Sequence, residues 1–281
     1  MAEKEDMNMT MSEDEYSELK RQEKAELFDL LSDATQKLLS GSKLREYADK
    51  QAQLFNHSVS NVLLIMEQDP DATWVRSYDE WQKDGVQVLK GQEGIRTLGS
   101  YRYQKSDGTL GMGSKVVRMF DVKQTAIKDF DIEGPSNRKV PDAIMNTYPA
   151  SVEVKELPDG EYALYDPEAK MIRVKEGLEP NVKVFVVARE QAMQIFTDDG
   201  RLPREEVMDK AEMAAYVVTR HYGFDAPEIA FGEMSSTYPG KEEKDVRAEL
   251  GSIKFAADRI DARVQEAIEL SRGSRDDRDA R

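Results

Sequence analysis

Helical hydrophobic spacing gives way to strand spacing along this chain, and the change restricts the fold to a mixture of helices and sheet. Apolar residues recur every three or four positions over residues 12–40 and again over residues 44–55. From residue 86 the apolar residues alternate instead, and seven glycines lie between positions 85 and 113. Helices followed by strands are typical of the α+β class, which we predict here.

The first half of the chain predicts a domain over residues 12–128, with helices first and a twisted antiparallel sheet second. The apolar faces of its first two helices are expected to pack on that sheet. Ser106-Asp107-Gly108-Thr109 has the composition of a hairpin turn. The predicted elements are helices over 12–40, 42–55, 58–66 and 78–83, and strands over 72–76, 97–105 and 115–122.

The second half predicts another domain, over residues 142–271. Glycine and proline lie among charges in residues 129–141, which read as a linker. Residues 1–11 and 272–281 have no periodicity and are expected to be disordered. The predicted elements of the second domain are a three-stranded meander over 151–156, 161–165 and 171–175, followed by three helices over 182–196, 204–222 and 242–271.

Composition excludes several classes of site. The chain has no cysteine and two histidines, which excludes disulfides and zinc sites with thiolate ligands. No apolar run approaches the roughly 20 residues of a membrane-spanning helix, and the acidic start does not resemble a signal peptide. We therefore expect a cytoplasmic bacterial protein that contacts no membrane and needs no cofactor.

One basic segment interrupts an acidic chain. Residues 72–128 carry ten Lys or Arg against six Asp or Glu, a net charge of +4, whereas the whole chain carries −15. Both tryptophans lie there, and so do Tyr78, Tyr101 and Tyr103. Basic groups neutralise phosphates and aromatic rings stack on unpaired bases, so this combination favours single-stranded nucleic acid. A second interpretation stays open, in which Tyr101 and Tyr103 form the buried face of a sheet.

The motifs of this segment resemble a known family. The series is Ser58-x-x-Asn61-x-Leu63-Leu64-Ile65, Gln68-Asp69-Pro70-Asp71-Ala72-Thr73, Trp81 with Gly85, Val88-x-Lys90-Gly91-x-x-Gly94-Ile95, and Val117-x-x-Phe120-Asp121-Val122-x-Gln124-Thr125. In this order it resembles the N-terminal domain of the ArdC/LtrC-like antirestriction proteins of plasmids and conjugative elements. His57 departs from the family, which has tyrosine before the serine. The resemblance implies binding of single-stranded DNA.

The basic segment and the family motifs together name the candidate contacts. The first set supplies phosphate or base contacts and comprises Arg76, Trp81, Lys83, Lys90, Arg96, Lys115 and Arg118. The second set follows from the motifs and comprises Ser60, Asn61 and Gln124. For Asn61 and Gln124 the alternative is structural, namely that they cap or bridge helix and sheet.

The second domain resembles the zincin-like metallopeptidase domain of the ArdC family, a layout shared with the ImmA/IrrE peptidases. The matching residues are Tyr165-Asp166-Pro167 before the strand 171–174, Glu190 in the next helix, and Ala211-Glu212-x-x-Ala215-Tyr216. In the family the first helix carries HExxH, whose two histidines hold zinc while the glutamate activates water.

Here that window reads Arg189-Glu190-Gln191-Ala192-Met193, so a cation and a thioether replace both histidines. Glu190 and Glu212 match the general base and the third ligand. We expect a domain without metal or catalysis, in which Arg189 pairs with Glu190 or Glu212.

Two functions remain in view. The first is a protein that binds and shields single-stranded DNA, as an antirestriction or DNA-transfer accessory of a plasmid, conjugative element or phage. The second is an acidic interaction module that inhibits a host nuclease or restriction enzyme without binding DNA. In either case, the acidic second domain could contact a protein of the host or of the element.

Overall fold

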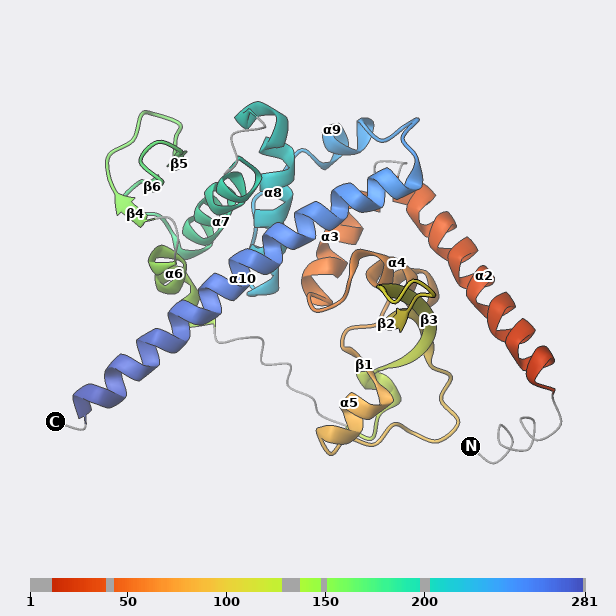
Figure 1. Cartoon of the computed structure of the whole chain (residues 1–281). Helices are drawn as coiled ribbons and strands as arrows, with labels where there is room; N and C mark the ends of the chain where they lie inside the picture. The colour runs from red at the N-terminus through yellow and green to blue at the C-terminus, as the bar shows by residue number, and fades with distance from the viewer. Residues whose placement is uncertain (1–11, 39–42, 128–136, 148–150, 198–202, 280–281) are drawn as a thin grey trace. The chain divides into compact units, whose positions relative to one another are not determined.

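The computed structural model describes residues 12–38, 43–127, 137–147, 151–197 and 203–279. They form two compact units (Figure 1). Unit 1 contains the described residues of 1–37 and 60–128, and unit 2 contains those of 38–59 and 129–281. Helices and small sheets are mixed, so the predicted α+β class is confirmed.

Unit 1 combines helices with an antiparallel sheet of strand order β1-β3-β2. Buried residues of α2 and α4, among them Leu27, Leu31, Leu63 and Ile65, belong to its core. Its elements are α2 (Glu13–Leu38), α4 (Val59–Gln68), β1 (Val75–Ser77), α5 (Tyr78–Lys83), β2 (Ile95–Gln104), β3 (Leu110–Asp121) and the 3-10 turn η1 (Val122–Gln124).

Strands β2 and β3 form one long hairpin across the predicted turn. Gly108 has φ +82°, a conformation that glycine adopts without steric cost. Strand β3 begins at Leu110, five residues before the predicted start. Gly111 and Gly113 precede the predicted start but belong to the strand, and each lies opposite a tyrosine of β2.

Helix α3 (Lys43–Gln53) corrects the predicted domain of residues 12–128. It lies in unit 2 and packs its apolar face, with Leu44, Tyr47 and Ala48, against α8 (Arg204–His221) and α9 (Phe231–Ser236) of the same unit. The Tyr216 hydroxyl of α8 donates a hydrogen bond to Asp49 (2.8 Å). Local spacing predicted the helix correctly but not the elements that it contacts.

Unit 2 places a small sheet beside a group of packed helices, in which α7, α8 and α10 contact one another. Helix α9 has no counterpart among the predicted elements. The remaining elements are η2 (Asn137–Lys139), α6 (Val140–Ala143), η3 (Ile144–Asn146), β4 (Ser151–Val154), β5 (Ala163–Asp166), β6 (Met171–Val174), α7 (Pro180–Thr197), α8 (Arg204–His221), α9 (Phe231–Ser236) and α10 (Glu243–Asp279).

Three predictions for this half are corrected. The strands are not a meander, because β6 is central and pairs in parallel with β4 and antiparallel with β5. The predicted linker ends too late, because residues 137–141 form η2 and the start of α6, and Val140 is buried. The predicted C-terminal tail is helical as far as Asp279, since no proline interrupts the backbone hydrogen bonds of α10.

Other predictions lie outside the described residues, namely the disordered segment 1–11 and most of the linker, residues 129–136. Among the described residues, none of the helices combines the length and the apolar character needed to cross a membrane.

Candidate nucleic-acid interface

Helix α4 holds the outer edge of β2 through two side-chain amides. The Asn61 amide donates to the Leu98 carbonyl (3.1 Å) and accepts from the Leu98 N–H (2.9 Å). Gln68 makes the same pair of bonds to Arg96, at 2.7 and 3.0 Å. Because β2 is an edge strand, these amides satisfy backbone groups that would otherwise lack a partner. Asn61 is 8% exposed, so the structure supports the bridging alternative for this residue.

Gln124 also has a structural role. Its Oε1 accepts from the Asp121 N–H (2.9 Å) and its Nε2 donates to the Glu93 carbonyl (2.8 Å), which caps η1. The capping alternative is therefore the one that the structure supports. Ser60 is half-buried in the first turn of α4.

Trp81, which was predicted to contact phosphate or base, belongs to the core of unit 1 and exposes almost no surface to a base. Its side chain is 1% exposed, and its indole N–H donates to the Phe120 carbonyl (2.8 Å). The Arg76 guanidinium lies 5.3 Å from the centre of the Trp74 ring and 5.7 Å from that of Trp81. It also forms an ion pair with Asp84. Arg76 is thus engaged by aromatic rings and a carboxylate of its own unit.

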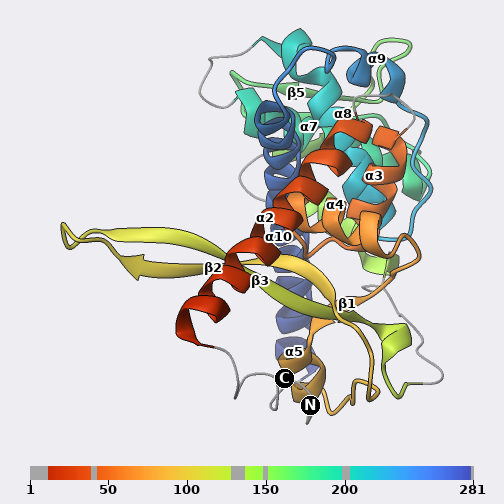
Figure 2. The same ribbon diagram turned by 90° about the vertical axis from the view of Figure 1, so that its right-hand side faces the viewer.

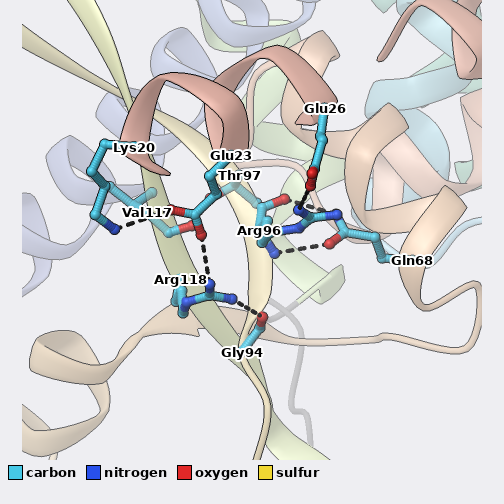
Figure 3. A network of polar contacts seen from close by, with 9 residues as sticks. All are labelled: Lys20, Glu23, Glu26, Gln68, Gly94, Arg96, Thr97, Val117 and Arg118. Carbon is cyan, nitrogen blue, oxygen red and sulfur yellow. Dashed lines mark hydrogen bonds and ion pairs between the residues drawn. The ribbon is translucent and has the colours of Figure 1, made fainter. Parts of the chain in front are cut away.

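Arg96 and Arg118 face each other across β2 and β3, and each pairs with a carboxylate of α2 (Figure 3). Arg118 lies 2.6 Å from Glu23, and Arg96 lies 3.1 Å from Glu26. Lys20 also binds Glu23, at 3.0 Å. These two arginines are therefore neutralised within unit 1.

Three predicted cations remain open. Lys83 ends α5, Lys90 lies in the turn before β2, and Lys115 lies on β3. All three are exposed, and no carboxylate among the described residues pairs with them. They are free to meet a phosphate.

The outer half of the β2–β3 hairpin extends away from the helices of unit 1 (Figure 2). We call residues 99–115 the arm. On one face Tyr101 lies opposite Gly113 and Tyr103 opposite Gly111. A Cβ atom at either glycine would lie 2.6 Å from the facing ring, so each ring lies directly over a glycine.

The tyrosine rings of the arm stay open to solvent on their other side. Tyr101 is 44% exposed and Tyr103 is 45% exposed, so the interpretation in which they form a buried sheet face is wrong. Their centroids lie 6.1 Å apart. Lys115 shares their face of the sheet, and Arg102 lies on the opposite face.

Of the first set of candidate contacts, only Lys115 lies in the arm, so the prediction did not identify the arm as a candidate site. Its signal was present in the alternation Tyr101-Arg102-Tyr103, followed across the turn by Gly111 and Gly113. Two open rings beside exposed cations can hold unpaired bases and their phosphates. The arm thus combines two exposed aromatic rings with exposed cations that pair with no carboxylate among the described residues.

Glu190 lies at the centre of the second predicted constellation, in unit 2. Its side chain is fully buried and accepts two hydrogen bonds from Arg204, at 2.8 and 2.9 Å. Arg189 donates to it at 2.9 Å, and so does the backbone N–H of Tyr165 (2.8 Å). The expected Arg189 pair is confirmed, whereas Arg204 had not been anticipated.

The donors around Glu190 do not fit a divalent cation. Arg189 and Arg204 occupy both of its oxygens, and Met193 is 1% exposed. Burial raises the pKa of Glu212, and the charge of Arg189 partly offsets the effect. His221 lies at the end of α8 and stacks on Phe55 at 4.0 Å. No group of three acidic, histidine or cysteine side chains suited to a metal occurs among the described residues.

Comparisons with known proteins agree with this architecture. Residues 32–129 match the family model of the N-terminal domain of anti-restriction factor ArdC. Two crystal structures of the antirestriction ArdC protein from the R388 plasmid, one metal-free and one Mn(II)-bound, each superpose with a TM-score of 0.54 at 14% identity. The superposition covers 85% of this chain for the metal-free structure and 84% for the Mn(II)-bound one, and 98% of the ArdC chain in both. A search of curated proteins found no match. The chain therefore has the fold of ArdC, and its residues 32–129 match the N-terminal domain of that antirestriction factor.

Proposed function

We propose that the protein binds single-stranded DNA through the arm, in an antirestriction role like that for which ArdC is named. The observation that carries the proposal is the pair Tyr101 and Tyr103, each resting on a glycine with its outer side exposed. The glycines opposite the two tyrosines leave room for each ring to lie over the neighbouring strand while its other side stays accessible. The family match of residues 32–129 supports the same function.

The chemistry of the arm favours single strands over duplex. In a duplex both faces of a base are already stacked, whereas an unpaired base offers a free face to a tyrosine ring. Lys105, Lys115 and Arg102 are exposed, and no carboxylate among the described residues pairs with them. They supply phosphate contacts that do not depend on sequence.

The arm tyrosines provide the direct test. A base stacked on an aromatic side chain contributes roughly 1–3 kcal/mol, so Tyr101→Ala combined with Tyr103→Ala, which removes two such stacks, should weaken binding of an oligothymidylate by at least about 30-fold. Fluorescence anisotropy at low salt measures the loss, and an unlabelled duplex serves as competitor.

Tyr162→Ala is the matched control, because Tyr162 is 49% exposed and lies in unit 2. It should leave the affinity unchanged. If the double variant binds as tightly as the unaltered chain, the arm is not the binding site. If the unaltered chain fails to bind at all, the acidic interaction module takes the place of this proposal, with residues 142–281 and their net charge of −10 as the partner surface.

We further propose that unit 2 is not a metallopeptidase. The support is the pairing of Glu190 with Arg189 and Arg204, which occupies the carboxylate that would activate water. We expect purified protein to carry far less than one zinc per chain after exhaustive desalting. Elemental analysis decides the point, and a stoichiometric metal that resists chelation would refute the proposal.

A further inference from the structure

Arg96 and Arg118 form a pair at the base of the β2–β3 hairpin. Arg96 and Arg118 are direct cross-strand partners, so their side chains leave the same face of the sheet. Like charges directly opposite each other are destabilising unless anions lie between or above them. A guanidinium binds a phosphate as readily as a carboxylate, through the same planar set of donors. The pair is therefore suited to two neighbouring phosphates.

Helix α2 supplies two carboxylates at this place. Glu23 and Glu26 are three residues apart, so they project from one side of the helix toward the pair (Figure 3). Burial would raise the pKa of Glu23, but the hydrogen bond from Lys20 and the charges of Lys20, Arg118 and Arg96 outweigh it and lower the pKa. Glu23 is thus charged at neutral pH, and both carboxylates occupy the position that phosphates would take.

The contact is open enough to be displaced. In the Arg96–Glu26 pair the side chains are 28% and 67% exposed, and an ion pair of this exposure is readily exchanged for other partners in solution. In the second pair Arg118 is 36% exposed but Glu23 only 13%, so Glu23 is the more covered of the two carboxylates. Glu23 and Glu26 also precede the matched family domain, which begins at residue 32, whereas both arginines lie within it.

The pair shares a face of the sheet with Arg102 of the arm, which is the face opposite to that of Tyr101 and Tyr103. Arg102 lies on the same face of β2 as Arg96, six residues along the strand, which corresponds to about 20 Å of extended backbone. A nucleic-acid strand that reaches Arg102 of the arm can therefore extend toward Arg96 and Arg118. It meets α2 there.

We propose that Arg96 and Arg118 are a second phosphate-binding site, and that Glu23 and Glu26 of α2 mask it as a built-in competitor of nucleic acid. This inference rests on the proposed function. Binding at the arm alone leaves α2 in place, whereas engagement of the full hairpin requires phosphates to displace both carboxylates.

The test compares two double variants that remove the same charge from the same helix. Glu23→Gln with Glu26→Gln unmasks the pair, whereas Asp29→Asn with Asp33→Asn serves as control. Asp29 and Asp33 are exposed, and no cation among the described residues pairs with them. Circular dichroism and thermal melting confirm that α2 is intact in both.

We expect the unmasked variant to bind oligothymidylate at least about 5-fold more tightly than the control. The log-log slope of affinity against salt should be steeper by about 1.4, because each of two added phosphate contacts contributes about 0.7 for single strands. Adding Arg96→Gln and Arg118→Gln to the unmasked variant should remove both gains.

The outcomes separate the two proposals. If the unaltered chain binds and the unmasked variant matches the control in affinity and in salt slope, masking is refuted while the proposed function stands. If neither the unaltered chain nor any variant binds, the proposed function fails and the masked site fails with it. If the unmasked variant alone binds, the second site is established independently of the arm.

Discussion

Trp81→Ala will lower the free energy of unfolding of unit 1 by about 3–5 kcal/mol, the usual cost of removing a large aromatic side chain from a core. Trp81 is 1% exposed, and the substitution also leaves the Phe120 carbonyl without its 2.8 Å hydrogen bond. The Arg76 guanidinium loses one of its two aromatic contacts as well. The loss is one of stability, and molecules that remain folded should still bind through the arm.

Urea titration followed by tryptophan fluorescence measures this loss, because Trp74 remains as a reporter within the same unit. Trp81→Phe is the matched control. It keeps an aromatic ring in the core and should be less destabilising. An alanine variant that melts like the unaltered chain but no longer binds oligonucleotide would show that Trp81 stacks on a base after all.

Glu190→Gln will destabilise unit 2 by about 3–5 kcal/mol, because it leaves two cations in a largely buried place without their counter-ion. The side chains of Arg189 and Arg204 are 17% and 29% exposed, and both donate to Glu190. Glutamine has nearly the same shape as glutamate, so the loss of stability measures the effect of removing the negative charge. Thermal melting followed by circular dichroism measures it.

Glu212→Gln is the control for that experiment, since Glu212 is half-buried and makes no ion pair with the described residues. It should change stability by less than about 1 kcal/mol. Replacing Arg189, Glu190 and Arg204 together with methionine should recover most of the lost stability, because buried ion networks often exchange for apolar side chains at little cost. A neutral effect of Glu190→Gln would mean that water already screens the cluster.

Local patterns predicted the elements of the fold well. The alternation and the Asp107-Gly108 turn predicted the hairpin, and helical spacing predicted α4 and α8. The partners of an apolar face are not encoded locally, which is why α3 was placed on the wrong domain. The same limit applies to β6, whose parallel partner β4 precedes β5 in the chain.

In the candidate site, too, local features were predicted and long-range contacts were not. Charge and composition identified the basic segment, but they did not separate buried from exposed members. Trp81 is covered by packing within unit 1, and the carboxylates that neutralise Arg96 and Arg118 lie 70 and 95 residues earlier in the chain. Arg204 was not predicted for a similar reason, since it lies on α8 and its hydrogen bond to Glu190 of α7 depends on how the two helices pack.

The location of α3 in unit 2 has a consequence for how the chain folds during synthesis. Gln53 ends α3, and its partner α8 begins at Arg204, about 150 residues later. At roughly 5–20 residues per second, a ribosome needs about 8–30 s to make that stretch. The apolar face with Leu44 and Tyr47 therefore lacks its partner α8 for that whole interval, during which residues 60–128 of unit 1 are also synthesised.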